Sequence, residues 1–321
     1  MRRNEVCISN SNDGMDELVE RVEALMENAR SPATRSGYAR DFSHYELFCH
    51  THALPALPPS PQVIALYLAE LSTRMRPATI ARRMAAIADQ SKRAGFGAEA
   101  LRSFIVRETW KGIRRTLGVA PAVKSPLTAS AIREMVRACP DTLIGRRDRV
   151  LALVGYAGGF RRSELADIRL SHLTFEPDSV DIYLPRSKTD QQGEGRTVTL
   201  PRGSLEETCP VTAIRNWLDS SGLREGLLLR SVNRHGRVGS GLNPDSIARI
   251  LKRVAARANL VIDISDVAGH SLRAGLVTEA SRQGMSPLAV MEVTGHRTVS
   301  IMKRYFRGQL VGGPSAAGAG L

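Results

Sequence analysis

The chain has 321 residues, of which 42% are hydrophobic, and its formal net charge at pH 7 is +13. This length allows two domains, and the hydrophobic fraction is typical of a soluble globular protein rather than of a disordered chain. Such an excess of positive charge attracts polyanions, and nucleic acid is the leading candidate, although the charge alone also fits a merely basic soluble protein.

The ends of the chain and its cysteines argue against several classes of protein. No segment approaches the ~20 apolar residues that a membrane helix needs. The N-terminal MRRNEVCISNSNDG lacks the apolar stretch of a signal peptide. The four cysteines form no CxxC pair and no zinc spacing, which predicts reduced, mostly buried thiols. We therefore expect a cytoplasmic protein that stays with a chromosome or plasmid.

The first part of the chain is predicted to be helical. Residues 1–13 are polar and are predicted to be disordered. Apolar residues then recur with helical periodicity, which predicts a compact helical domain over 14–117. The expected helices are 15–28 (apolar stripe Leu18, Val22, Leu25 and Met26), one from Pro32 through Phe48, 61–73, 77–94 and 99–117.

The second part mixes helices with a few strands. Residues 118–126 (GVAPAVKSP) lack periodicity and predict a linker to a second domain at 127–307. That domain is expected to open with a helix capped by Thr128, followed by a buried helix at 147–157. Strand composition appears at 172–176, 180–184 and 197–200, and helices return at 210–220, 244–258, 271–283, 286–293 and 298–306. The fold class is thus mainly α with a small antiparallel sheet, and 308–321 form a flexible tail.

Two pairs of residues suit the binding of a phosphate. Arg161 and Glu164, in GFRRSEL (159–165), share one face at a helix start. A guanidinium there can bind two phosphate oxygens while the carboxylate fixes its orientation. His270 and Arg273, in GHSLRAG (269–275), repeat this arrangement at another helix start, which also favours an anion. Taken singly, the first pair could be a surface ion pair, and the second a partly buried histidine with a solvated arginine.

Lys188 and His296 are further candidates. Lys188 lies beside a predicted hairpin tip, in RSKTDQQGEGR (186–196). Lysines there are usually solvated turn residues, but this one could reach a groove and protonate a leaving oxygen. His296, in TGH, could donate a hydrogen bond to a phosphate or could cap a helix. No metal is expected at His270 and His296, because no third ligand has a useful spacing.

Tyr305 lies nine residues after His296, in MKRYF (302–306). A tyrosine beside Phe306 would normally be a core residue. Cations surround this one in the sequence, however, and they would favour the phenolate of a group whose usual pKa is ~10. These cations are Lys303, Arg304 and Arg307.

These stretches resemble the tyrosine recombinases, the phage integrase family, and most of all its Cre-like members. The family pattern has an arginine in a G-[LMF]-R-x-S-E-L turn, a hairpin lysine, an H-x-x-R box, a G-[HW] pair and a tyrosine nine residues later. The matching residues are Arg161, Lys188, His270 with Arg273, His296 and Tyr305. The resemblance spans 14–307, tightly in the second half. It implies a two-domain DNA clamp, with a helical core-binding (SAM-like) domain and a catalytic domain.

The resemblance also implies a mechanism. Tyr305 would attack a DNA phosphorus and form a 3′-phosphotyrosyl bond, without a metal, ATP or another cofactor. Arg161, Arg273 and a histidine would stabilise the phosphate oxygens, with Glu164 supporting them. Lys188 would act as the general acid, and His270 would assist proton movement at Tyr305.

The partner implied is double-stranded DNA with a specific, inverted-repeat site, and no membrane. A homotetramer, weakly associated without DNA, would act on two duplexes through a Holliday junction. The expected DNA contacts on helix 77–94 are Arg82, Arg83, Lys92 and Arg93, against the alternative of a solvated basic face. Only 16 residues follow Tyr305 and no arm-binding domain precedes residue 14, so we expect a simple recombinase.

Three other functions compete with this prediction. A type IB topoisomerase-like enzyme would share the chemistry but let the nicked strand rotate. A catalytically silent DNA-binding protein would bind a site without forming a covalent adduct. A basic nucleic-acid chaperone would leave the ordered set of motifs unexplained.

Overall fold

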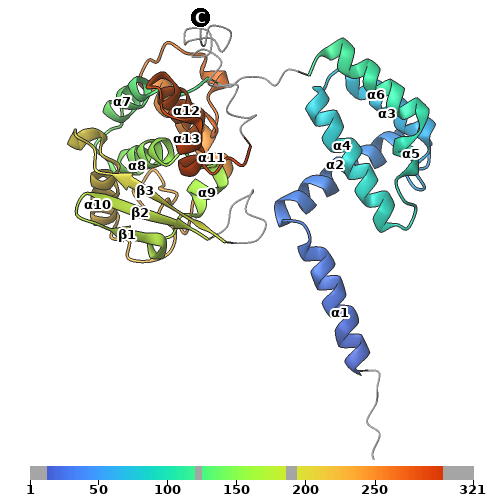
Figure 1. The fold of residues 1–321 in the computed structure, drawn as a ribbon, viewed down its shortest axis with the longest axis horizontal. Helices are drawn as coiled ribbons and strands as arrows, with labels where there is room; N and C mark the ends of the chain where they lie inside the picture. Colours follow the sequence, from blue (N-terminus) through green and yellow to red (C-terminus); the bar gives the residue numbers. More distant parts are fainter. Residues whose placement is uncertain (1–12, 120–124, 186–193, 299–321) are drawn as a thin grey trace, which may run out of the picture. The chain divides into compact units, whose positions relative to one another are not determined.

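The computed structural model describes residues 13–119, 125–185 and 194–298, and the chain divides into two compact units between Ala122 and Val123. Figure 1 shows that the first unit is helical, whereas the second adds a three-stranded antiparallel sheet to its helices. The mainly α fold class with a small sheet is therefore confirmed. The expected helix at 298–306 lies almost entirely outside the described residues, and the tail at 308–321 lies wholly outside them.

The first unit is built around the second and third of its helices. Its helices are α1 (Asp13–Asn28), α2 (Pro32–Thr51), α3 (Pro61–Ser72), α4 (Pro77–Arg93), α5 (Glu99–Arg102) and α6 (Phe104–Leu117). Helix α2 packs against α4, and α3 packs against α6. In the core, the rings of Tyr45 and Phe48 each lie 5.1 Å from the ring of Tyr67 between centroids. Proline in the first turn starts α2, α3 and α4, because its fixed φ suits that position.

Two features of this unit differ from what the sequence alone shows. The single helix expected at 99–117 is interrupted at Ser103, whose ψ of 156° is incompatible with a continuing helix. The helix expected at 15–28 is present as α1, but its apolar stripe is not buried in this unit: Leu18 is 57% and Leu25 is 62% exposed. Periodicity predicts a helix and its apolar side, but it does not say what covers that side.

The second unit surrounds a central helix. Its helices are α7 (Ala129–Arg137), α8 (Leu143–Ala157), α9 (Arg162–Asp167), α10 (Pro210–Ser221), α11 (Pro244–Arg257), α12 (Ser271–Arg282) and α13 (Pro287–Thr294), with short 3-10 turns at Leu170–His172, Glu206–Thr208 and Ile264–Asp266. Helix α8 contacts α7, α9, α10, α11 and α12 and is buried over most of its length. As predicted, Thr128 caps α7 by accepting a hydrogen bond from the amide of Ala131.

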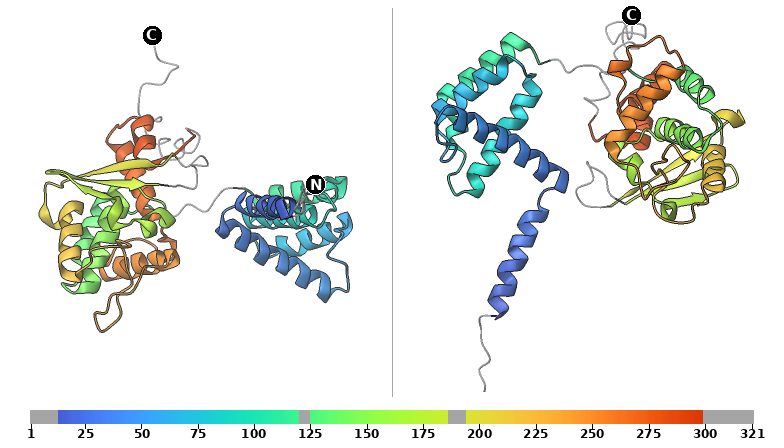
Figure 2. Two further views of the ribbon diagram at one scale, coloured as in Figure 1. Left: turned by 90° about the horizontal axis from the view of Figure 1, so that it is seen from below. Right: turned by 180° about the vertical axis from the view of Figure 1, so that it is seen from behind.

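The sheet forms one side of this unit, as both views in Figure 2 show. Its strands are β1 (Leu173–Phe175), β2 (Ser179–Leu184) and β3 (Arg196–Pro201), in the order β1-β2-β3. On β3 the buried Val198 and Leu200 alternate with exposed threonines. Side chains of a strand alternate between its faces, so Arg196, two residues before Val198, falls on the inward face. Arg196 pairs with Leu184 at the end of the β2–β3 ladder.

Candidate active site

Arg161 and Glu164 form a linked pair at the start of α9. Arg161 is the N-cap residue, and its amide donates to Glu164 Oε2 at 2.9 Å. Its Nη1 donates to Glu164 Oε1 at 2.5 Å. The Arg161 side chain is 18% exposed and that of Glu164 only 3%. The pair is therefore not a solvated surface ion pair, and the carboxylate fixes the guanidinium in one orientation.

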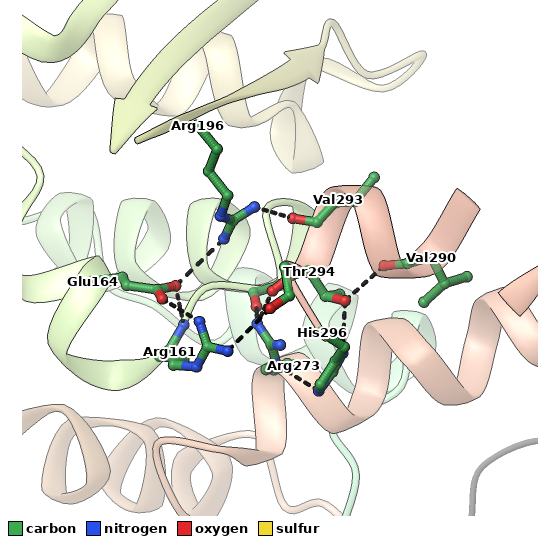
Figure 3. Close-up of polar contacts among 10 residues, drawn as sticks. Arg161, Glu164, Arg196, Arg273, Val290, Val293, Thr294 and His296 are labelled. Atoms are coloured by element: carbon green, nitrogen blue, oxygen red, sulfur yellow. Dashed lines mark hydrogen bonds and ion pairs between the residues drawn. The ribbon is translucent and has the colours of Figure 1, made fainter. Parts of the chain in front are cut away.

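Arg273 approaches the same place from the first turn of α12. It is 1% exposed, and its Nη1 donates to the carbonyl of Gly159 at 2.8 Å and to that of Thr294 at 2.5 Å. Arg161 Nη2 donates to the next carbonyl, that of Gly295, at 3.1 Å. Figure 3 shows that both guanidiniums point toward the turn that ends α13 and leads to His296. Segments far apart in the sequence thus place two cations side by side.

His296 completes this turn, and its neighbours define its protonation. Thr294 Oγ1 donates to the carbonyl of Val290 at 2.6 Å, which uses its only proton. The 2.7 Å contact between Thr294 Oγ1 and His296 Nδ1 is then donated by the imidazole. His296 Nε2 is left as an acceptor and receives Arg273 Nε at 3.3 Å. In this structure His296 therefore has the Nδ1–H tautomer.

The electrostatics of the cluster keep both histidines neutral. Burial, followed by the charges of Arg273 and Arg161, lowers the pKa of His296 to about 3. Although His270 is exposed at the N-cap of α12, desolvation of its ring and then the same two arginines lower its pKa as well. Both imidazoles are therefore uncharged at pH 7, and the surrounding cations favour a bound anion.

Arg196 is a member of this cluster that the sequence analysis missed. Its Nη2 donates to Glu164 Oε2 at 3.4 Å, and its Nη1 donates to the carbonyl of Val293. The signal that could have found it is strand alternation, because Arg196 shares the inward face of Val198 and Leu200. Thr294 was missed too, because its role depends on a contact with the imidazole that no motif shows.

Replacing Thr294 by valine tests this assignment of the histidine. The substitution keeps the shape of a fully buried side chain but leaves His296 Nδ1–H without its acceptor. We expect the free energy of unfolding to fall by about 1–3 kcal/mol, as measured by urea denaturation.

Thr278→Val is the matched control for this substitution. Thr278 makes the same bond to the carbonyl four residues earlier, at 2.7 Å to Ala274, and the structure records no hydrogen bond from it to an imidazole. We expect this control to cost less than about 1 kcal/mol. Equal losses for the two variants would mean that His296 does not depend on Thr294.

Two predicted site residues, Lys188 and Tyr305, lie outside the described residues. The structure brings Arg161 into contact with Glu164 and Arg273 into contact with His296, and the two arginines donate to the neighbouring carbonyls of Gly295 and Thr294. It places His270 at the start of the helix that carries Arg273. Three of the four cysteines are free and buried, as expected, and the fourth, Cys7, is not described.

Within 13–119, 125–185 and 194–298, no group of three or more His, Cys, Asp or Glu side chains could hold a metal ion. The same ranges contain no helix that is both long and apolar enough to cross a membrane.

The predicted DNA contacts on α4 differ from one another. Arg82 is exposed but donates both Nε and Nη2 to the buried carboxylate of Asp41, at 2.6 and 2.9 Å. The expectation for Arg83 is wrong: it is 8% exposed and donates to the hydroxyl of Tyr67 at 3.1 Å. It lies three residues after Ile80 and four before Ile87, on the buried face of the helix. The exposed candidates at the end of α4 are Lys92 and Arg93.

Helix α6 presents a second basic surface, which the sequence analysis did not single out. Its exposed cations are Arg107, Lys111, Arg114 and Arg115. Cations spaced three, four and seven residues apart lie on one side of a helix, so this surface could bind phosphates without reading bases.

The sequence pattern of the phage integrase family matches residues 126–309. The chain is 33% identical over 284 residues to the integrase/recombinase xerD homolog of Selenomonas ruminantium, covering 87% of this chain and 83% of the relative.

Solved structures share the fold. The Tn1549 transposon integrase in complex with transposon right end DNA aligns with a TM-score of 0.62 and 14% identity, over 89% of this chain and 92% of that one. A λ integrase tetramer bound to a Holliday junction aligns with a TM-score of 0.54 and 15% identity, over 93% and 83%. The family match and the similarity to the Selenomonas relative, together with the arginine–histidine cluster, show that the chain belongs to the phage integrase family and is a tyrosine recombinase.

Proposed function

We propose that this site-specific recombinase holds the scissile phosphate of DNA at the cluster of Arg161, Arg273 and His296, and that Tyr305 attacks it. The observation that carries the proposal is the convergence of Arg161 and Arg273 on the carbonyls of Thr294 and Gly295, directly before His296. Preorganised cations at this place stabilise the charge that develops on the non-bridging oxygens in the transition state.

The proposed cleavage step needs two proton transfers. The Tyr305 oxygen forms a bond to phosphorus while the bond to the 5′-oxygen breaks, which yields a 3′-phosphotyrosyl bond and a 5′-hydroxyl. His270, which its lowered pKa keeps uncharged and so free to accept, takes the tyrosine proton, and Lys188 donates a proton to the leaving oxygen. Attack by the 5′-hydroxyl of a partner strand reverses these transfers and rejoins the DNA, so the bond energy is retained without ATP.

His296 and Arg273 have different roles in this proposal. A phosphate beside His296 raises the pKa of the imidazole, so that Nε2 gains a proton and can donate to the anion. Arg273 is 1% exposed and donates to His296 and to the carbonyl of Thr294, so its charge acts on the phosphate from a buried position and holds the residues around His296 in place. Arg161, at 18% exposure, is the more accessible of the two arginines.

The proposed partner is double-stranded DNA of a chromosome or plasmid with an inverted-repeat site. Lys92 and Arg93 of α4 and the basic surface of α6 would supply phosphate contacts. Four copies would act on two duplexes, in support of which the structurally similar λ integrase was solved as a tetramer on a Holliday junction.

A covalent-trapping assay tests the function. The wild-type chain and Tyr305→Phe are incubated with nicked duplexes that carry randomised flanks, in the presence of EDTA, and are separated on denaturing gels. We expect a shifted protein–DNA band in the wild type alone, because only a phosphotyrosyl bond survives denaturation. Sequencing of the trapped DNA then gives the target site.

Two results would contradict the proposal. A band that persists in Tyr305→Phe would assign the nucleophile to another residue. No band in the wild type, despite tight and salt-sensitive binding, would instead indicate a DNA-binding protein without cleavage activity.

A further inference from the structure

Arg196 is a largely buried cation whose nitrogens all face the protein. Its side chain is 18% exposed, and burial lowers its pKa from the usual range while Glu164 opposes that shift. Nη1 and Nη2 donate to Val293 and Glu164. Nε is buried and lies so close to Gly295 that a Cβ built there would be 3.0 Å away. The guanidinium of Arg196 is therefore used for contacts within the protein: two of its nitrogens have acceptors and the third is buried.

Arg196 closes a ring of contacts around the phosphate cluster. Glu164 accepts from Arg161 through Oε1 and from Arg196 through Oε2, so the two cations share one carboxylate. Arg161 in turn donates to Gly295, and Arg196 donates to Val293, two residues earlier in the same turn. The ring thus joins the start of α9, the start of β3 and the end of α13 (Figure 3).

We propose that Arg196 is a positioning residue for strand cleavage that acts through Glu164, while its bond to the carbonyl of Val293 holds Arg196 itself in place. Without it, Glu164 keeps only its two bonds to Arg161, so the carboxylate and the guanidinium of Arg161 that it orients lose one of the contacts that fix them. The carbonyl of Val293 also loses a charged donor beside His296. Because a displacement of about 1 Å at a reacting centre can cost ~10²-fold in rate, these two contacts matter for chemistry more than for affinity. The proposal rests on the proposed function, since it assigns a role in the same cleavage step.

The test measures covalent-complex formation by Arg196→Met under single-turnover conditions, at saturating DNA and over a range of DNA concentrations. We expect the maximal rate to fall by about tenfold to a hundredfold, while the DNA concentration at half-maximal rate changes less than about threefold. Arg196→Lys should recover part of the rate, because an ammonium can reach Glu164 or Val293 but not both. Arg202→Met, an exposed arginine just beyond β3, should match the wild type.

A double-mutant cycle with Glu164→Gln separates positioning from general stabilisation. If Arg196 acts through Glu164, the double variant should be little slower than the slower single variant. Fully additive losses would overturn the proposal. So would a tenfold loss of DNA affinity with a weaker salt dependence, because that would show direct contact with a phosphate.

Two controls keep the outcomes distinct. A wild-type chain that forms no covalent complex contradicts the proposed function, whereas a wild-type chain that cleaves alongside an equally active Arg196→Met contradicts only this inference. If Arg196→Met does not fold, as circular dichroism would show, the charge-retaining Arg196→Lys in the same cycle decides between coupling to Glu164 and independence from it.

Discussion

Replacing Arg161 by lysine is expected to slow covalent-complex formation by about 10²–10³-fold, the loss typical of removing one preorganised donor to a developing oxyanion. Arg161 now uses Nη1 for Glu164 and Nη2 for Gly295, in a fixed plane. An ammonium keeps the positive charge but cannot hold these two partners and a phosphate in the same geometry. The variant should therefore fold and bind DNA, yet cleave slowly.

The next residue in the chain is the matched control. Arg162, which is 47% exposed, forms an ion pair at 2.9 Å with Asp245, which is 77% exposed. Exposed pairs of this kind contribute little, roughly 0–1 kcal/mol, so Arg162→Lys should cleave nearly as fast as the wild type. Single-turnover trapping at saturating DNA compares the two variants. A loss of less than about tenfold in Arg161→Lys would show that charge alone, without the fixed plane, suffices at this position.

The spacing of residues within one helix was enough to predict the pairs that lie at a single helix start. Arg161 and Glu164 lie three residues apart, so the beginning of α9 alone brings them together. The same holds for His270 and Arg273 at α12. The sequence also predicted the strands and most helices, because alternation and helical periodicity are local properties.

The contacts between these segments were not predicted from spacing. Arg196 reaches Glu164 across 32 positions and Val293 across 97, and only the folded chain shows that these meet. The inward direction of Arg196 could nevertheless have been inferred, because alternate residues of a strand share a face and Arg196 alternates in this way with the buried Val198 and Leu200 of β3.

Arg83 shows the opposite failure, in which composition was preferred over periodicity. The helix 77–94 is rich in cations, so all of its arginines were assigned to an exposed face. Arg83 shares the face of Ile80 and Ile87, however, and a buried guanidinium needs polar partners: the Tyr67 hydroxyl accepts a hydrogen bond from it, and Asp41 forms an ion pair with it at 3.9 Å. Those acceptors come from other helices, and no local pattern identifies them.

The second large effect is expected at Gly275, in the middle of α12, where the chain entering the second unit lies directly on the helix. The amide of Leu127 donates to the carbonyl of Ser271 at 3.0 Å, and Leu127 is fully buried. A Cβ at Gly275 would come within 1.8 Å of the Leu127 carbonyl oxygen and 2.5 Å of its carbon. The Leu127 backbone is fixed by its hydrogen bond and by burial, so its atoms cannot move away from the added methyl group as the end of a flexible side chain could.

Gly275→Ala is therefore expected to lower the free energy of unfolding of the second unit by about 1–3 kcal/mol or more, the usual cost of overpacking. For a domain of this size, each kcal/mol lowers Tm by roughly 2–4 °C, which calorimetry can resolve. Arg273 lies two positions away on the same helix, so a shift of α12 also displaces it from Thr294 and His296, and cleavage should slow.

Gly112→Ala is the control that separates steric conflict from the helix preference of alanine. Gly112 lies within α6, is exposed, and has no heavy atom within 4 Å of a built Cβ. There, alanine restricts the unfolded chain without a clash, so the variant should be stabilised by about 0.4–1 kcal/mol. The two substitutions are chemically identical. If they change the free energy of unfolding in opposite directions, the difference comes from the contact with the Leu127 carbonyl. If Gly275→Ala melted at the wild-type temperature or above it, the close packing of Leu127 on α12 would be wrong, and with it the support that this contact gives to Arg273.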